Sequence, residues 1–93
     1  MSINSILVNS KDNVCVATVA FKKGETACYQ DGDTVREVVL VTDVPIYHKY
    51  ARVPIQKDEN IVKYGQVIGA ATCDVPAGTH IHTQNVRSLR QLF

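Results

Sequence analysis

This chain of 93 residues has no tryptophan and only two phenylalanines, Phe21 and Phe93. It therefore lacks a series of aromatic rings on which bases could stack, and its net charge of +1 creates no strong field toward an anionic partner. No apolar run approaches the roughly 20 residues that cross a bilayer. The first residues also lack the basic segment and apolar stretch of a signal peptide. We therefore expect neither a nucleic acid nor a membrane as a partner.

Cysteine is also scarce, because Cys15, Cys28 and Cys73 are the only three. Their number is odd and their spacing does not match a metal site. We expect buried free thiols in a reducing compartment in preference to a disulfide or a catalytic thiol. The expected location is the cytoplasm.

Helix signals are weak, and only residues 48–53 and 85–92 could form a helical turn or two. Short runs rich in β-branched residues dominate instead and predict strands at 3–8, 14–21, 34–44, 60–67 and 79–86. In the run at 14–21 both faces are apolar enough to be buried. A chain of this length is expected to form one domain, residues 1–93.

One short pattern occurs three times, at residues 21–27, 55–61 and 75–81. Each copy has an apolar residue, two spacers, a Gly or Asp, two more spacers and a second apolar residue. Gly24, Asp58 and Gly78 suit a turn position of positive φ, and the apolar ends would enter the core on either side of the turn. The pattern predicts short strands, many reversals and little helix, as in a compact all-β barrel-like or clip-like domain.

His80 and His82 are two residues apart in a predicted strand, so their side chains would project from the same face. That spacing suits two ligands to one metal, or a base and an anion contact in one pocket. A solvated strand face is an equally good interpretation of the same pair.

His48-Lys49 follows Pro45, which favours an extended or turned segment. A Lys beside a His at a loop tip could clamp a carboxylate and exchange a proton; the alternative is a solvated basic loop. Lys63-Tyr64-Gly65 could simply be a strand end with a hairpin turn at Gly65, with Tyr64 half-buried and Lys63 pointing to water.

Taken together, the motifs over residues 12–88 resemble the N-terminal domain of altronate dehydratase-type hydro-lyases. This family includes galactarate dehydratase and the sulfolactate sulfo-lyase small subunit. The motifs are Asp12-Asn13-Val14-x-Val16-Ala17, Pro45-x-x-His48-Lys49-x-Ala51, Ile61-Val62-Lys63-Tyr64-Gly65-x-x-Ile68-Gly69-x-Ala71 and Gly78-x-His80-Ile81-His82-x-x-Asn85. Such domains are similar to SAF, or antifreeze-like, modules, so the resemblance implies a small β-clip fold.

The resemblance also implies a site shared with a much larger domain or subunit. Together the two eliminate water, or sulfite in the sulfo-lyase, from a sugar or hydroxy acid, generally with a divalent metal such as iron held mainly by the partner. Elimination next to a carboxylate needs a base, an acid and stabilisation of an enolate. The implied catalytic residues are His48, Lys49 and His82, the implied substrate contacts are Lys63, Tyr64 and Asn85, and the metal candidates are His82 and His80, with His80 the more structural of the two.

Two positions depart from the family pattern. Tyr47 stands where the family usually has Gly before the His-Lys pair, and Tyr does not take a positive φ cheaply. The loop is therefore expected to be re-shaped, or Tyr47 to line the pocket. Gln84 stands where the fuller pattern often has a third His.

The leading hypothesis is the small subunit of a two-subunit hydro-lyase acting on a sugar acid such as altronate, because fused relatives continue past the point where this sequence ends. The sulfolactate sulfo-lyase small subunit is a variant of it. A second hypothesis is a non-catalytic SAF module that binds a sugar or a carboxylate. A third is a structural lid or dimerisation element, since exposed strand edges favour pairing with a second copy or with the large subunit.

Overall fold

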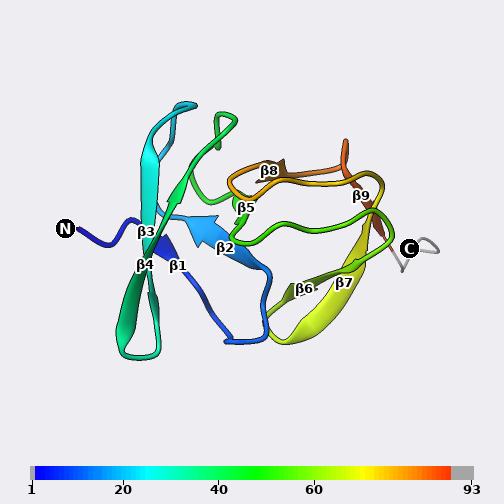
Figure 1. Ribbon diagram of the computed structural model, residues 1–93, viewed down its shortest axis with the longest axis horizontal. Helices are drawn as coiled ribbons and strands as arrows, with labels where there is room; N and C mark the ends of the chain where they lie inside the picture. The colour runs from blue at the N-terminus through cyan, green and yellow to red at the C-terminus, as the bar shows by residue number, and fades with distance from the viewer. Residues whose placement is uncertain (1, 89–93) are drawn as a thin grey trace.

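The computed structural model describes residues 2–88, and these contain strands, turns and loops but no helix. The strands are β1 (Ser5–Ile6), β2 (Val14–Ala17), β3 (Thr26–Asp31), β4 (Thr34–Val39), β5 (Lys49–Ala51), β6 (Asn60–Lys63), β7 (Gln66–Ala71), β8 (His80–Ile81) and β9 (Val86–Ser88) (Figure 1). The predicted small all-β domain is therefore confirmed.

All strand pairs are antiparallel, and they form three small sheets. The β3–β4 hairpin stands at one end of the elongated molecule, the β6-β7-β9 sheet lies at the other, and the β1-β2-β5-β8 sheet lies between them (Figure 1). The middle sheet makes β8 the neighbour of β5, with His80 opposite Tyr50 and Ile81 opposite Lys49. This pairing brings the two histidine-bearing segments together.

The repeated turn pattern forms the predicted structure. Gly24, Asp58 and Gly78 have φ values of 93, 70 and 88°. The apolar residues on either side of these turns are buried: Phe21, Ala27, Ile55, Ile61, Val75 and Ile81. The pattern was therefore sufficient to identify three of the reversals from local sequence alone.

A fourth copy of the same turn lies at residues 44–50, where Tyr47 takes φ 67°. The sequence pattern missed this turn because it required Gly or Asp at the position of positive φ, and tyrosine rarely takes that conformation. The four turns pair in twos: Phe21 bridges Val44, and Ile55 bridges Val75. Matching hydrogen bonds from a backbone N–H to an aspartate side chain recur in the two halves. Lys23 N donates to Asp43 Oδ1 at 2.8 Å and Lys57 N donates to Asp74 Oδ1 at 2.9 Å, so the domain is built from two similar units.

Each unit encloses its own apolar core. The first core is closed by Tyr29 and Tyr50, and its other members are Cys15, Ala17, Phe21, Ala27, Leu40 and Val44. The second consists of smaller aliphatic side chains: Val14, Ala51, Ile55, Ile61, Ala71, Val75 and Ile81. β2 and β5 contribute to both cores because successive residues of a strand point to opposite faces. The expectation that both faces of the run at 14–21 are buried holds for β2, whereas Val19 and Ala20 beyond its end are exposed.

Several predicted strands were too long. The runs at 3–8, 14–21 and 34–44 shrink to β1, β2 and β4, and the run at 79–86 ends after β8 and resumes only at β9. The prediction of one strand over residues 60–67 was wrong. This segment is the β6–β7 hairpin with its turn at Tyr64-Gly65, as the alternative interpretation held. The strands β3 and β5 were missed.

The suggested helical turns are not present in the described residues. Residues 48–53 contain β5 instead, because pairing with β2 on one side and β8 on the other satisfies backbone groups of this strand. Of the second segment, residues 86–88 form β9, while its last four residues lie outside the described range. No helix in the described part of the chain is long and apolar enough to span a membrane.

Candidate functional site

All three histidines of the chain lie together. The ring centroids of His48, His80 and His82 are 5.1 to 5.4 Å apart in every pair. Nδ1 of His48 is 2.9 Å from Nε2 of His80, so one of these nitrogens donates a hydrogen bond to the other. The rings of His48 and His82 are nearly parallel, at 11°. We call these three residues the histidine cluster.

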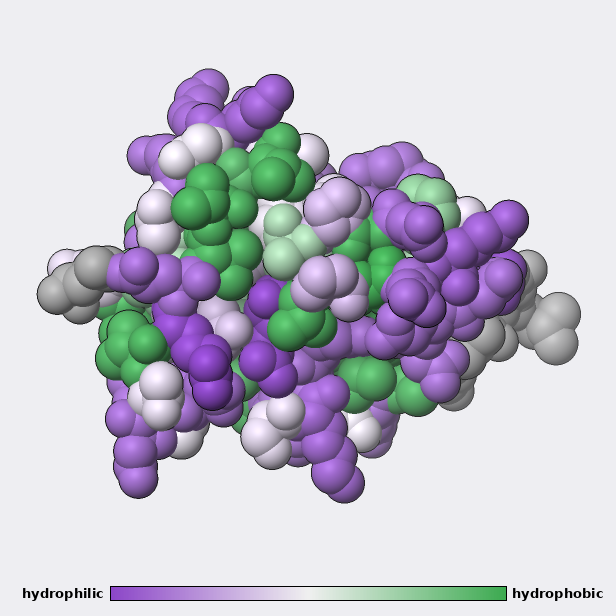
Figure 2. Space-filling view, in the orientation of Figure 1, coloured by the Kyte–Doolittle hydropathy of each residue, from purple (hydrophilic) through white to green (hydrophobic). Residues whose placement is uncertain are grey.

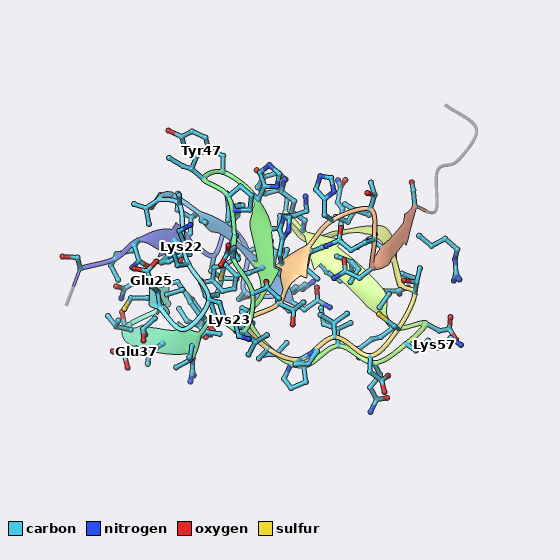
Figure 3. The ribbon with its side chains drawn as sticks, turned by 90° about the horizontal axis from the view of Figure 1, so that it is seen from above. Lys22, Lys23, Glu25, Glu37, Tyr47 and Lys57 are labelled. Atoms are coloured by element: carbon cyan, nitrogen blue, oxygen red, sulfur yellow. The ribbon has the colours of Figure 1, made fainter. Side chains whose placement is uncertain are left out.

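His48 is positioned by the fourth turn. Tyr47 N donates to Ala17 O at 2.8 Å, and Ala17 N donates to His48 O at 2.9 Å. These bonds hold Tyr47 in a left-handed conformation that costs a non-glycine residue about 1 kcal/mol or more. Tyr47 thus takes the positive φ that a tyrosine was expected to avoid, and the residue, 73% exposed, stands out from the body (Figure 3).

His80 and His82 are positioned by one buried amide. Asn85 Nδ2 donates to His80 O at 2.8 Å, and His82 N donates to Asn85 Oδ1 at 3.0 Å. His80 N also donates to the Thr42 hydroxyl at 2.9 Å. The predicted contact of Asn85 with substrate stays a prediction, and the structure adds a role in holding this segment.

Two lysines lie beside the cluster. Lys49 is half-buried, and burial followed by repulsion from Lys63 lowers its pKa. Burial also lowers the pKa of His80, with smaller contributions from His48, His82 and Lys49. These shifts indicate that Lys49 lies close enough to Lys63, and His80 close enough to Lys49 and the other two histidines, for their positive charges to repel.

None of the ion pairs found within residues 2–88 involves these five side chains. The ion pairs found there join Asp31 to Arg36 and Arg52, and Asp58 to Arg87. Lys49 and Lys63 therefore place positive charge beside the histidine cluster, which suits an anionic ligand.

A groove of about 230 Å³ opens next to this surface. Lys49 and His82 supply its charged or titratable lining, Thr83 and Ser88 its hydroxyl groups, and Ile68, Ile81 and Val86 its apolar wall. Its size suits a small carboxylic acid or part of one.

Tyr64 and Lys63 lie at the turn between β6 and β7. Tyr64 has φ 56° and is 55% exposed, and the Lys63 ammonium lies 4.6 Å from the centre of its ring. The carboxylate of Asp12, itself 2% exposed, accepts hydrogen bonds from Tyr64 N at 2.9 Å and Gly65 N at 2.7 Å. Asp12 was known only as part of a motif, and the structure shows that it fixes the turn that carries Lys63.

The structure thus brings His48, His80 and His82 together, with Lys49 and, through electrostatic contact, Lys63. Sequence spacing paired only His80 with His82. As the rings stand, no three side chains of metal-ligating type in the described residues converge to hold an ion. Imidazole is nevertheless a suitable ligand for iron, zinc and nickel.

Comparison with known proteins gives a consistent result. The model of the family described as "Altronate/galactarate dehydratase SAF domain" matches residues 3–89. Altronate dehydratase of Escherichia coli K12 is 40% identical over 83 residues, and that of Bacillus subtilis 168 is 34% identical over 84. Each alignment covers 89% of this chain but 16% of the relative, so the chain spans about a sixth of their length.

A relative of similar size also exists. The (2R)-sulfolactate sulfo-lyase subunit alpha of Chromohalobacter salexigens is 30% identical over 93 residues, covering 97% of this chain and 99% of that one. The domain therefore occurs both as a small part of a larger enzyme and as a named subunit.

Proposed function

The chain belongs to the altronate/galactarate dehydratase SAF domain family, and from this we propose that it is the small subunit of a hydro-lyase that removes water from a sugar acid such as altronate. A large subunit would close the active site over the histidine cluster. The observation that carries the proposal is the unneutralised group of His48, His80, His82, Lys49 and Lys63 beside an open groove.

The substrate is an anion, and the two lysines are the fixed positive charges that would hold it. Lys49 lies at the groove, and Lys63 is close enough to repel it. A carboxylate placed between them relieves that repulsion, and it also leaves both lysines able to stabilise charge that develops on the same group during elimination. Tyr64, next to Lys63, would contact the sugar chain.

The proton transfers would fall to imidazole. His82 lines the groove and His48 stacks against it, with ring centroids 5.3 Å apart, and imidazole is a common general acid and base. One would take the proton next to the carboxylate and the other would assist the departing hydroxyl. His80 hydrogen-bonds to His48 and so sets which nitrogen of His48 carries its proton.

The divalent metal implied by the family resemblance would stabilise the enolate charge when bound. We propose that it lies at the junction with the large subunit, which would supply ligands that this chain lacks.

The large partner is supported by the relatives' sizes. This domain makes up 16% of the two altronate dehydratases, and the sulfo-lyase relative is named as one subunit. Apolar surface also gathers over the end of β4 and the following loop (Figure 2), where Val39, Val41 and Ile46 are exposed. Such surface in a small domain is typical of a contact region. Pairing of two copies through the open strand edges is the alternative occupant.

Co-expression with the large hydro-lyase subunit of the same organism tests the proposal. We expect a stable complex that dehydrates altronate, and His48→Ala should lower kcat at least about 100-fold without dissociating it. Lys57→Ala, at the far end of the molecule (Figure 3), is the matched control and should be fully active. Absence of a complex, or full activity of His48→Ala, contradicts the proposal.

Two other functions remain testable in the same experiment. Release of sulfite from sulfolactate, with no dehydration of altronate, would identify a sulfo-lyase subunit, which the similar length of that relative favours. Sub-millimolar binding of sugar acids by the isolated chain, with no complex formed, would identify a binding module. We propose a cytoplasmic location, because the odd number and the spacing of the cysteines favour thiols in a reducing compartment. Of the thiols expected to be buried, those of Cys15 and Cys28 are, whereas Cys73 is exposed.

A further inference from the structure

Tyr47 and Gly78 occupy equivalent positions in the two units of the domain. Tyr47 N donates to Ala17 O at 2.8 Å, and Ala17 N donates to His48 O at 2.9 Å. The second unit repeats both bonds, at 2.7 and 3.0 Å, between the Gly78 turn and Ala51. Tyr47 and Gly78 also share a positive φ, of 67° and 88°. The two turns therefore have the same backbone structure and differ in the residue at that position.

The Gly78 turn is covered by another part of the chain. Val41 N donates to Gly78 O at 3.0 Å, and a methyl group at Gly78 would collide with Val39 O. The covering segment, residues 39–41, directly follows β4 in the first unit. Because this segment lies so close to the turn, only glycine fits there.

The Tyr47 turn has no such cover from residues 2–88. Tyr47 is 73% exposed and stands out from the body of the molecule (Figure 3). Val19 and Ile46 are 42% and 43% exposed, and they lie in the two segments that the Phe21–Val44 bridge holds together. An aromatic ring and two aliphatic side chains are therefore left in water on one side of the first unit.

This arrangement is unfavourable for the isolated chain. A positive φ costs a non-glycine residue free energy, and an exposed ring regains little of it through packing. Glycine would remove the strain and open no hole, because Tyr47 belongs to neither core. Tyrosine is also one of the residue types that most often supply the binding energy of protein interfaces, where the side chain enters a pocket of the partner. The position favours a ring that is buried on association.

Two observations favour the large subunit over a second copy as the partner. The Tyr47 turn leads directly into His48 and Lys49, so a chain that covers Tyr47 also borders the histidine cluster. In a symmetric pair joined at this surface the same residues would meet, and the ammonium groups of the two Lys49 side chains would repel each other. The altronate dehydratases, of which this domain is 16%, have most of their chain outside it.

We propose that the large hydro-lyase subunit covers the Tyr47 turn with an extended segment, as residues 39–41 cover the Gly78 turn, and receives the Tyr47 side chain in an apolar pocket. Val19 and Ile46 complete the contact. The inference rests on the proposed function, because it requires the large subunit, and it names the contact that holds that subunit next to His48. It also gives the replacement of the family's usual glycine by Tyr47 a role in assembly.

The affinity of the large subunit for variants of this chain tests the inference. Tyr47→Gly should weaken the complex at least tenfold in calorimetric titration, while the Tm of the isolated variant is no lower than that of the original chain. Poor folding would then not account for the lost affinity. Asp58→Gly is the matched control, because Asp58 is also exposed, also has a positive φ of 70°, and is adjacent to Lys57 at the far end of the molecule (Figure 3). This control should bind as the original chain does.

Photo-crosslinking gives an independent measurement. Tyr47→p-benzoylphenylalanine should form its crosslink with one segment of the large subunit, which mass spectrometry identifies. Unchanged affinity of Tyr47→Gly, or crosslinks only between copies of this chain, overturns the inference.

The same measurements separate this inference from the proposed function. A complex that depends on Tyr47 but does not dehydrate altronate overturns the proposed function alone. An active complex that Tyr47→Gly does not weaken overturns this inference alone, and the absence of any complex overturns both.

Discussion

Nδ1 of His48 lies 2.9 Å from Nε2 of His80, although 32 residues separate them along the chain. The contact exists because β5 and β8 are paired with Tyr50 opposite His80. Tyr50 is fully buried and bonds to Ser5 Oγ at 2.7 Å, so the register of this pair is fixed by the core. The position of the histidine cluster thereby depends on the packing beneath it.

Asp12→Ala should destabilise the domain by about 3 kcal/mol, because it removes a buried carboxylate that accepts bonds from Asn9, Tyr64 and Gly65. Urea denaturation measures the loss. Glu37→Ala, on the exposed face of β4, is the control and should change stability by less than about 0.5 kcal/mol. Equal stability of the two variants would contradict the role given to Asp12.

Asn85→Ala should cost about 1 to 3 kcal/mol, since two buried hydrogen bonds to the backbone of His80 and His82 are lost. The amide of His82 should then exchange its hydrogen faster, which NMR detects residue by residue. Gln84→Ala, one position earlier and exposed, should leave both quantities unchanged. Unaltered exchange at His82 in the Asn85 variant would show that the amide does not hold this segment.

Lys49→Met should stabilise the isolated chain while it abolishes substrate binding in the complex. Burial and repulsion from Lys63 lower the pKa of Lys49, so the charged amine is disfavoured in the folded state. Its removal should add about 0.5 kcal/mol and raise Tm by roughly 2 to 4 °C. Thermal unfolding below pH 9, where the amine is charged in the unfolded chain, gives the measurement, and Lys57→Met is the exposed control. A lower Tm for Lys49→Met would contradict this reasoning.

Cys73 should react rapidly with a thiol reagent at pH 8, whereas Cys15 should react only after unfolding. Burial raises the pKa of the Cys15 thiol to about 12, with a smaller opposite effect from its hydrogen bond with Tyr50, and the reactive form is the thiolate. Mass spectrometry of the labelled chain before and after denaturation distinguishes the two sites. Labelling of Cys15 in the native chain at pH 8 would be inconsistent with the buried core described for β2.

Gly78→Ala should prevent stable folding, whereas Gly24→Ala should cost only about 1 kcal/mol. Both residues have positive φ, but a methyl group at Gly78 would collide with the carbonyl oxygen of Val39, while nothing lies within 4 Å of one at Gly24. Circular dichroism and urea denaturation compare the pair. Similar stability of the two variants would show that the close approach of the Gly78 turn to β4 does not contribute.

Local sequence was enough to predict the reversals at Gly24, Asp58 and Gly78, since positive φ and flanking apolar residues are properties of a few neighbouring residues. The same logic failed at Tyr47. The positive φ of Tyr47 is imposed by backbone hydrogen bonds to Ala17, which lies 30 residues earlier in the chain, and not by the conformational preference of tyrosine. Strand lengths were overestimated for a related reason, because β propensity does not say where a pairing partner ends.

The sequence by itself determined an all-β chain of short strands and tight turns, and its motifs identified the family to which it belongs. Whether the His80-x-His82 pair formed half of a site or a solvated face could not be decided from spacing, which reports only which residues share a strand face. The tertiary structure adds His48 and Lys49 to the same surface by pairing β5 with β8, while the half-site interpretation stays a prediction. Such a pairing depends on the burial of Tyr50 and Ile81 in two separate cores, and this is a property of the whole fold that no local pattern contains.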